Sequence, residues 1–148
     1  MTPPEIRATR ILAVDFGDRR TGLAATDPTG TIVVPLEPLV GLDDAGCAAA
    51  IAALARERDA QAVVLGLPLS AEGSRGPRAK RTLAFAARLG PLLPCPLVTV
   101  DESHSTDEAH ALLKAGGMKA ARRKRVADSI AAMVILERYR GPTRKLDS

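Results

Sequence analysis

Aromatic side chains are the scarcest class in this sequence. Its 148 residues include two phenylalanines, Phe16 and Phe85, one tyrosine, Tyr139, and no tryptophan. Proteins that hold single-stranded nucleic acid by base stacking use aromatic platforms, so the sequence argues against that mode of binding. Hydrophobic residues make up 46% of the chain, and the core must therefore be aliphatic.

Cysteines and long apolar runs are also few. Cys47 and Cys95 lie far apart and match no metal-ligand spacing, so we expect two reduced thiols in a cytoplasmic protein. No stretch approaches the ~18 apolar residues of a membrane span, and "MTPPEIRATR" lacks the apolar part of a signal peptide. We expect one domain over residues 1–148, with no membrane partner and with short flexible ends at about 1–9 and 141–148.

Charge gives a mild indication of partners. Lys and Arg number 21 against 17 Asp and Glu, a net charge of +4, with a pI near 9.5. A basic balance is compatible with polyanionic partners such as nucleic acids. The same value is also common among proteins that bind no nucleic acid.

Apolar runs separated by turn signals predict a mixed α/β fold. We expect strands at 11–15, 22–27, 31–39, 61–68 and 96–100, and helices at 43–58, 77–89, 105–116 and 126–139. Pro35 and Pro38 cannot donate to a ladder, so the third strand belongs at a sheet edge. The pattern predicts an RNase H-like layout: a five-stranded mixed sheet in the order 3-2-1-4-5, with helices on both faces.

The helices also allow a prediction of which sides face the core. In the helix at 77–89 we expect Ala79, Leu83 and Ala86 to face inward. The helix at 126–139 is apolar nearly all round from Ile130, and we expect it to pack on the sheet. The residues predicted along its packed side are Val126, Ile130, Met133 and Val134.

Three carboxylates follow or begin elements that this sheet would bring together. Asp15 ends the first strand, Glu102 follows the fifth, and Asp128 stands in the first turns of the last helix. Clustered carboxylates repel one another unless a cation neutralises them, and Mg²⁺ takes oxygen ligands and bridges to phosphate. Two such ions about 4 Å apart can drive phosphodiester hydrolysis. Each acid also has a structural interpretation, as a turn former or as an acid near a helix N-terminus.

Four motifs in order resemble the YqgF family of RNase H-like proteins. The opening pattern D-F-G-x-K/R-R-x-G-x-A-x-x-D reads here as "DFGDRRTGLAATD". The V-x-G-L-P-L loop with its G-x-x-G-P reads as "VLGLPLSAEGSRGP". The D-E-R-x-T/S-T-x-E-A segment reads as "DESHSTDEA", and the final K-x-D-x-x-A-A-x-x-I-L helix as "KRVADSIAAMVIL".

The resemblance implies metal-dependent hydrolysis of phosphodiester bonds. It maps the catalytic acids onto Asp15, Glu102 and Asp128, which are also the expected ligands of Mg²⁺ (or Mn²⁺). The family is described both as pre-16S rRNA nucleases and as Holliday junction resolvases. We therefore expect processing of the 5′ end of pre-16S rRNA in ribosome biogenesis, with structured RNA and the ribosome as partners. Cleavage of branched DNA is the alternative.

Basic residues near the acids are candidate phosphate contacts. The stretch "KAARRKR" at 119–125 has five cations in seven positions, which favours a grip on phosphates but is also common on solvated helix surfaces. The predicted nucleic-acid-binding residues are Arg19, Arg20, Ser70, Arg122, Arg123, Lys124 and Arg125.

Three positions depart from the family pattern. Asp18 replaces the usual Thr, Ser70 the usual Asn, and Ser103 the usual Arg. Asp18 adds a negative charge near Asp15, and the change at position 103 removes a cation suited to bidentate phosphate binding. These departures leave a non-catalytic nucleic-acid-binding module as an alternative. Actin-like ATPases also use a D-x-G hairpin, but they need two such domains.

Overall fold

The computed structural model describes residues 9–68, 76–101 and 129–140, and one five-stranded mixed sheet forms its centre. The strands are β1 (Ile11–Asp15), β2 (Arg20–Thr26), β3 (Val33–Val40), β4 (Ala62–Leu67) and β5 (Leu97–Asp101). Their order is β3-β2-β1-β4-β5. β2 is antiparallel to β1 and β3, whereas β4 is parallel to β1 and β5. The predicted strand order is confirmed.

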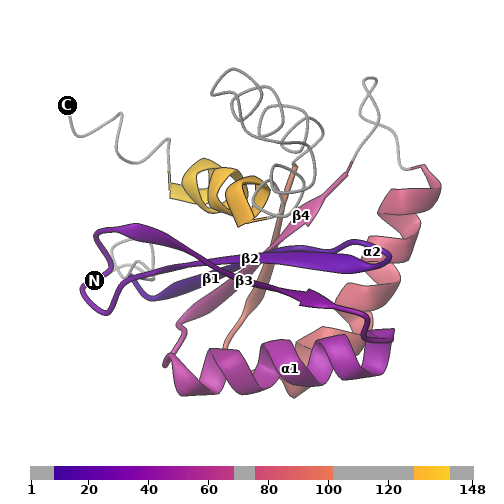
Figure 1. The fold of residues 1–148 in the computed structure, drawn as a ribbon, viewed down its shortest axis with the longest axis horizontal. Coiled ribbons are helices and arrows are strands. Elements are labelled where there is room, and N and C mark those ends of the chain that lie inside the picture. Colours follow the sequence, from indigo (N-terminus) through magenta and orange to yellow (C-terminus); the bar gives the residue numbers. More distant parts are fainter. Residues whose placement is uncertain (1–8, 69–75, 102–128, 141–148) are drawn as a thin grey trace, which may run out of the picture.

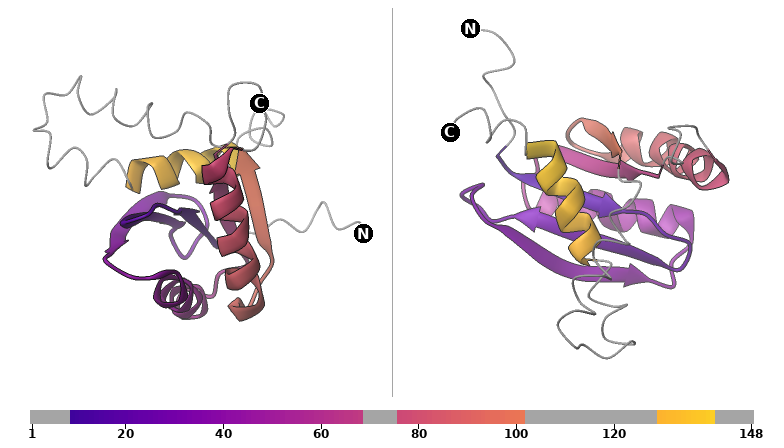
Figure 2. Two further views of the ribbon diagram at one scale, coloured as in Figure 1. Left: turned by 90° about the vertical axis from the view of Figure 1, so that its right-hand side faces the viewer. Right: turned by 90° about the horizontal axis from the view of Figure 1, so that it is seen from above.

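Helices cover both faces of the sheet, as Figure 1 and Figure 2 show. α1 (Asp44–Glu57) and α2 (Pro77–Leu89), which leads into the short 3-10 helix η2 (Gly90–Leu92), pack on one face. Residues 129–140 form a helix on the other face, hereafter helix 129–140. The predicted helix at 105–116 lies outside the described residues. Within the described ranges, no helix is long and apolar enough to cross a membrane.

Local signals explain where several elements begin and which strand lies at the edge. Asp43 caps α1, because its side chain accepts a hydrogen bond from the amide of Gly46 at 2.7 Å. Pro77 occupies the first turn of α2, where a missing N–H costs nothing. β3 carries Pro35 and Pro38 and lies at the sheet edge, as predicted.

The two faces of β1 belong to two different cores. Leu12 and Val14 pack with α1 and α2, whereas Ala13 packs with helix 129–140. Successive side chains of a strand point to opposite faces. Asp15 is therefore directed to the face that helix 129–140 covers.

The inward side of α2 differs from the one that the sequence predicts. Ala79, Thr82 and Phe85 are buried, while Leu83 and Ala86 are half-buried. The large ring of Phe85 determines the orientation, and Thr82 tolerates burial because its hydroxyl donates to the Arg78 carbonyl at 2.9 Å. The predictions of Ala79 and of Ala86, which packs half-buried against this core, were right. Leu83, the third predicted residue, is not among the residues packed in this core.

Helix 129–140 packs on the sheet as predicted, but through another side. The fully buried residues are Ala131, Ala132, Ile135 and Leu136. Of the predicted residues, Met133 is half-buried and packs against this core, Ile130 and Val134 are half-buried, and Val126 lies outside the described residues. A sequence that is apolar nearly all round gives no periodic signal for choosing a side, and the small alanines allow the closest approach to the sheet.

A tight turn joins β1 to β2. A Cβ atom on Gly17 would overlap the carbonyl oxygen of Arg20, so the turn needs the close backbone approach that only glycine allows. The carbonyl oxygen of Arg19 accepts a hydrogen bond from the Gly41 amide at 3.1 Å. The turn is thereby also fixed to the end of β3.

We expect Gly17→Ala to lower the free energy of unfolding by about 1–3 kcal/mol, because the turn must shift to admit a methyl group. Gly90→Ala is the matched control, since its added Cβ would meet only a Leu97 carbon at 3.9 Å, an ordinary contact distance. Urea unfolding followed by circular dichroism measures both values. Equal stability of the two variants would contradict the proposed requirement for glycine.

The side chain of Asp27 organises the turn between β2 and β3. Its carboxylate accepts hydrogen bonds from the amides of Ile32 and Thr31 at 3.0 and 2.9 Å and from the Thr29 hydroxyl at 2.8 Å. These bonds, that from Ile32 first, lower the pKa of Asp27 below its ordinary 3.8. The charged form is favoured in the folded state, so its stabilising contribution is present above pH 3.8 and disappears as the pH falls through the lower, folded-state pKa.

We expect Asp27→Ala to lower the Tm at neutral pH, because three hydrogen bonds of the turn are lost. The difference in Tm between this variant and the parent should shrink as the pH falls below 3.8. Thermal unfolding at a series of pH values measures it. A difference that stays constant across the acid range would refute the assigned role.

Candidate active site at the carboxyl end of β1

Asp15 stands at the end of the central strand, as the strand order requires. It pairs with Gly22 on β2, and on its other side β1 runs parallel to β4 as far as the pair Val14–Leu65. Only 8% of Asp15 is exposed. Ligands of open α/β sheets bind beyond the carboxyl ends of such strands, so this carboxylate occupies the position from which chemistry is expected.

The residue after Asp15 is held from the opposite face of the sheet. The rings of Phe16 and Phe85 are stacked, with centroids 4.0 Å apart and planes within 5°. Both rings are nearly fully buried. The stack joins the end of β1 to α2 and uses both phenylalanines of the chain.

Arg81 of α2 completes this support with all three nitrogens of its guanidinium group. Nε contacts Asp18 Oδ1 at 2.8 Å, and Nη1 and Nη2 contact the Asp44 carboxylate at 3.3 and 3.2 Å. The guanidinium carbon lies 5.1 Å from the centroid of the Phe16 ring. The hydrogen bond with Asp18 is the main cause that raises the pKa of Arg81. The extra charge of Asp18 is therefore paired with a cation.

Helix 129–140 is fixed to both edge strands of the sheet. The pairing of β2 with β3 is interrupted by a β-bulge, because the register shifts after Thr21 and before Leu23. The hydroxyl of Ser129 donates to the carbonyl oxygen of Leu36, next to this bulge, at 2.8 Å. At β5, Arg138 donates to the carbonyl oxygen of Asp101 at 2.9 Å.

Only some of the predicted site residues belong to the described ranges. Arg19 is exposed in the turn after Asp15, and Arg20 is half-buried as the first residue of β2. Within those ranges no group of three or more His, Cys, Asp or Glu side chains could hold a metal ion. The predicted residues that lie outside the described ranges are Glu102, Asp128, Ser70, Arg122, Arg123, Lys124 and Arg125.

Sequence reasoning missed the contribution of Arg81 and Asp44 to this site. Arg81 lies 63 positions from Asp18 and 37 from Asp44, so no local spacing connects them. The available signal was the aromatic scarcity, since two lone phenylalanines in an aliphatic core are candidates for a mutual contact. The unexplained charge of Asp18 was a second indication that a cation lies nearby.

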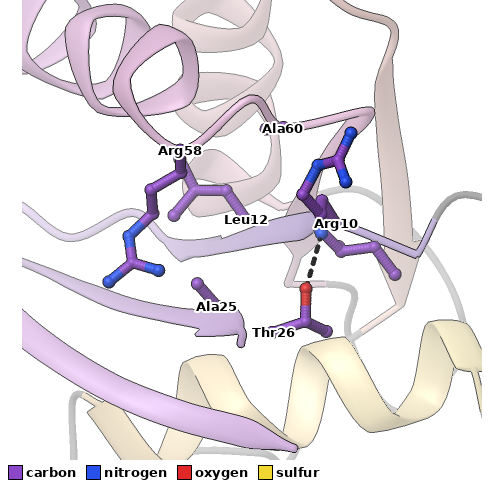
Figure 3. A pocket seen from close by; sticks show the side chains of 7 residues that line it. Arg10, Leu12, Ala25, Thr26, Arg58 and Ala60 are labelled. Atoms are coloured by element: carbon purple, nitrogen blue, oxygen red, sulfur yellow. Dashed lines mark hydrogen bonds between the residues drawn. The ribbon is translucent and has the colours of Figure 1, made fainter. Parts of the chain in front are cut away.

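A small pocket at the other end of β1 is not part of this site (Figure 3). The residues that line it are Arg10, Ile11, Leu12, Ala25, Thr26, Arg58 and Ala60. Its volume is about 10 Å³, enough for about one water molecule. The Thr26 hydroxyl there accepts from the Ile11 amide and donates to the Thr9 carbonyl, each at 2.9 Å. The pocket has no room for a nucleotide.

Curated proteins similar to this chain carry the name "Putative pre-16S rRNA nuclease". The protein of that name from Kineococcus radiotolerans is 47% identical over 130 residues, which is 85% of this chain and 68% of the relative. The one from Synechococcus elongatus is 41% identical over 128 residues, 86% of each chain. The one from Streptomyces coelicolor is 37% identical over 135 residues, 90% of this chain and 81% of the relative.

Two solved structures have a similar fold. RuvC of T. thermophilus in complex with a Holliday junction substrate has a TM-score of 0.51 at 16% identity, covering 83% of this chain and 88% of RuvC. Fowlpox virus resolvase in complex with Holliday junction DNA also has a TM-score of 0.51, at 12% identity, covering 88% of this chain and 95% of the resolvase. At these identities the likeness concerns the fold alone, and it confirms the RNase H-like architecture.

The family comparison gives the same answer as the sequence motifs. The model described as "RuvX: Holliday junction resolvase" matches residues 9–140. That range contains every described residue as well as all four motifs. Together with relatives at 37–47% identity, the match means that this chain belongs to the RuvX Holliday junction resolvase family, also called YqgF.

Proposed function

We propose that this chain is a divalent-metal-dependent endonuclease that processes the 5′ end of pre-16S rRNA during ribosome biogenesis. The observation that carries the proposal is the buried carboxylate of Asp15 at the carboxyl end of the central strand, in a chain of the RuvX family. The name shared by its curated relatives supports the choice of substrate.

The proposed metal ligands are the side-chain oxygens of Asp15, Glu102 and Asp128. Carboxylates are the hard oxygen donors that Mg²⁺ and Mn²⁺ prefer, so the donor set fits these ions. A divalent ion held by these residues would supply activation of a water molecule and stabilisation of the leaving oxygen of the phosphodiester. Because Asp15 is the only one of the three within the described ranges, the proposal depends on the other two joining it.

Two anchored neighbours support that convergence. Glu102 directly follows Asp101, whose carbonyl oxygen is bound by Arg138 of helix 129–140. Asp128 directly precedes Ser129, whose hydroxyl is bound to the edge strand β3. Asp15 is directed to the face that this same helix covers. Glu102 and Asp128 are thus each adjacent in sequence to a residue that takes part in a hydrogen bond between helix 129–140 and the sheet.

The chain's own residues would orient the substrate without reading its sequence. Arg19 and Arg20 stand in and directly after the turn that follows Asp15, and we propose that they bind phosphates together with Ser70 and the cations at 122–125. Phosphate contacts fix position but carry no sequence information. The scarcity of aromatic residues favours a structured substrate over unstacked single strands.

A four-way DNA junction is the second candidate substrate. The description of the matching family favours it directly. Phosphates of RNA and DNA offer a metal ion the same oxygens, and the 2′-hydroxyl is the group by which a protein distinguishes them. The described residues therefore do not select between the two substrates, and a direct comparison is required.

We further propose that the chain folds as one domain; apart from residue 9, the predicted flexible ends at about 1–9 and 141–148 lie outside the described residues. The described elements support this because they share a single sheet. A pre-16S rRNA nuclease would work in the cytoplasm in association with ribosomal precursors.

We expect the purified chain to cleave end-labelled pre-16S RNA when Mg²⁺ or Mn²⁺ is present and to lose this activity in EDTA. Asp15→Asn should reduce cleavage by at least about 100-fold, because one ligand oxygen loses its charge. Asp59→Asn is the matched control, since this exposed residue lies beyond the C-terminus of α1 and asparagine also tolerates its positive φ of 54°. Gel analysis of the products gives the rates.

A four-way DNA junction, tested in parallel, separates the two substrates. Faster cleavage of the junction than of the RNA would mean that branched DNA, and not pre-16S rRNA, is the preferred substrate. Equal cleavage of both substrates by Asp15→Asn and the parent would refute the role of Asp15 and indicate a contaminating nuclease.

A further inference from the structure

Three elements meet at one guanidinium group on the side of the sheet opposite to the one that Asp15 faces. Arg81 extends from α2, Asp18 lies in the turn between β1 and β2, and Asp44 begins α1. The side chains of Arg81, Asp18 and Asp44 are 44%, 80% and 37% exposed. We call these three residues the Arg81 bridge.

The Arg81 bridge acts on the turn at two points. Asp18 holds the turn directly, three residues after Asp15. The guanidinium group also lies against the ring of Phe16, which is covalently next to Asp15 and stacked on Phe85. Phe16 thus contacts two residues of α2, Arg81 and Phe85, which tie the end of β1 to that helix.

We propose that Arg81 is a positioning residue for Asp15: by fixing the turn at 16–19 against α1 and α2, it fixes the direction of the Asp15 carboxylate. This inference rests on the proposed function, in which Asp15 holds the metal. It also gives a role to Asp18, the departure from the family pattern that otherwise only adds negative charge beside the site. In this chain Asp18 provides the attachment of the turn to Arg81.

Exposed ion pairs contribute little to folding, because water screens them. The Arg81 bridge therefore contributes little to the free energy of unfolding of the whole chain. Small displacements of a catalytic group, in contrast, have large effects on rate. The contribution of Arg81 should accordingly be seen in local order and in turnover, with a minor change in Tm.

The chemistry of the contact requires an arginine. Arg81 uses Nε for one carboxylate and Nη1 and Nη2 for another, while its guanidinium carbon lies over the Phe16 ring. A lysine carries one ammonium group and cannot make these contacts simultaneously. Arg81→Lys thus keeps the positive charge but loses the simultaneous contacts with Asp18, Asp44 and Phe16.

Hydrogen exchange at the Gly41 amide tests the proposal without any substrate or metal. This amide donates to the carbonyl oxygen of Arg19 in the turn, so it reports on whether the turn is fixed. We expect exchange in the full chain to accelerate about tenfold in both Arg81→Gln and Arg81→Lys. Arg88→Gln, the same change two turns further along α2, is the matched control and should leave exchange unchanged.

A double-mutant cycle tests whether Asp18 and Arg81 act through one contact. Asp18→Asn alone should accelerate exchange at Gly41, and adding it to Arg81→Gln should have no further effect. In cleavage assays Arg81→Gln should lower kcat about tenfold with KM nearly unchanged, whereas Arg88→Gln should match the parent.

Three results would overturn the proposal. Exchange in Arg81→Gln that equals exchange in Arg88→Gln would mean that the bridge does not hold the turn. A full additional effect of Asp18→Asn in the Arg81→Gln background would mean that the two residues do not act together. Faster exchange at Gly41 with an unchanged kcat would mean that the turn does not position the Asp15 carboxylate. If the parent cleaves no nucleic acid, the proposed function fails, and the exchange cycle still decides whether Arg81 fixes the turn.

Discussion

A carboxylate at the end of a strand that is buried on both faces is the constraint on which this structure depends. β1 is buried along its whole length, and Asp15 remains only 8% exposed at its end. A charged group in such a place is costly unless polar groups or a cation compensate it. In the proposed function, a divalent ion shared with other carboxylates would add to the interactions that Asp15 already makes and would make this position a site for chemistry.

The alternation of side chains along β1 assigns different tasks to the two faces of the sheet. Asp15 is directed toward helix 129–140, whose ends are fixed by Ser129 and Arg138. Phe16 is directed the other way, to Phe85 and the Arg81 bridge. The contacts that hold the turn therefore lie on the face of the sheet opposite to the one toward which Asp15 is directed.

The sequence was sufficient to predict the topology because the relevant signals are local. Two prolines identify β3 as an edge strand, and the continuous apolar run at 11–15 is typical of a strand buried on both faces. Asp43 and Pro77 indicate where α1 and α2 begin. The inward sides of α2 and helix 129–140 were predicted only in part, because Phe85, Ile135 and Leu136 were not expected there. A helix that is apolar nearly all round has no periodic signal, and the single large ring of Phe85 outweighs several small residues.

At the site, too, features with a local sequence signal could be predicted, whereas features that depend on packing could not. The place of Asp15 follows from the strand order, because it is the last residue of the central strand. The Arg81 bridge could not be predicted, because its contacts connect residues 37 and 63 positions apart and depend on how two helices pack. The family motifs predict Asp15, Glu102 and Asp128 as the catalytic acids, whereas only the packed structure relates Asp18 to a cation on another element.

Anomalous diffraction from crystals soaked in Mn²⁺ tests the central claim most directly. The account predicts a manganese peak within coordination distance of the Asp15 carboxylate, with side-chain oxygens of Glu102 and Asp128 completing its ligands and the peak absent in crystals of Asp15→Asn. Manganese bound elsewhere, or a peak at this place that persists in the Asp15→Asn crystals, would contradict it.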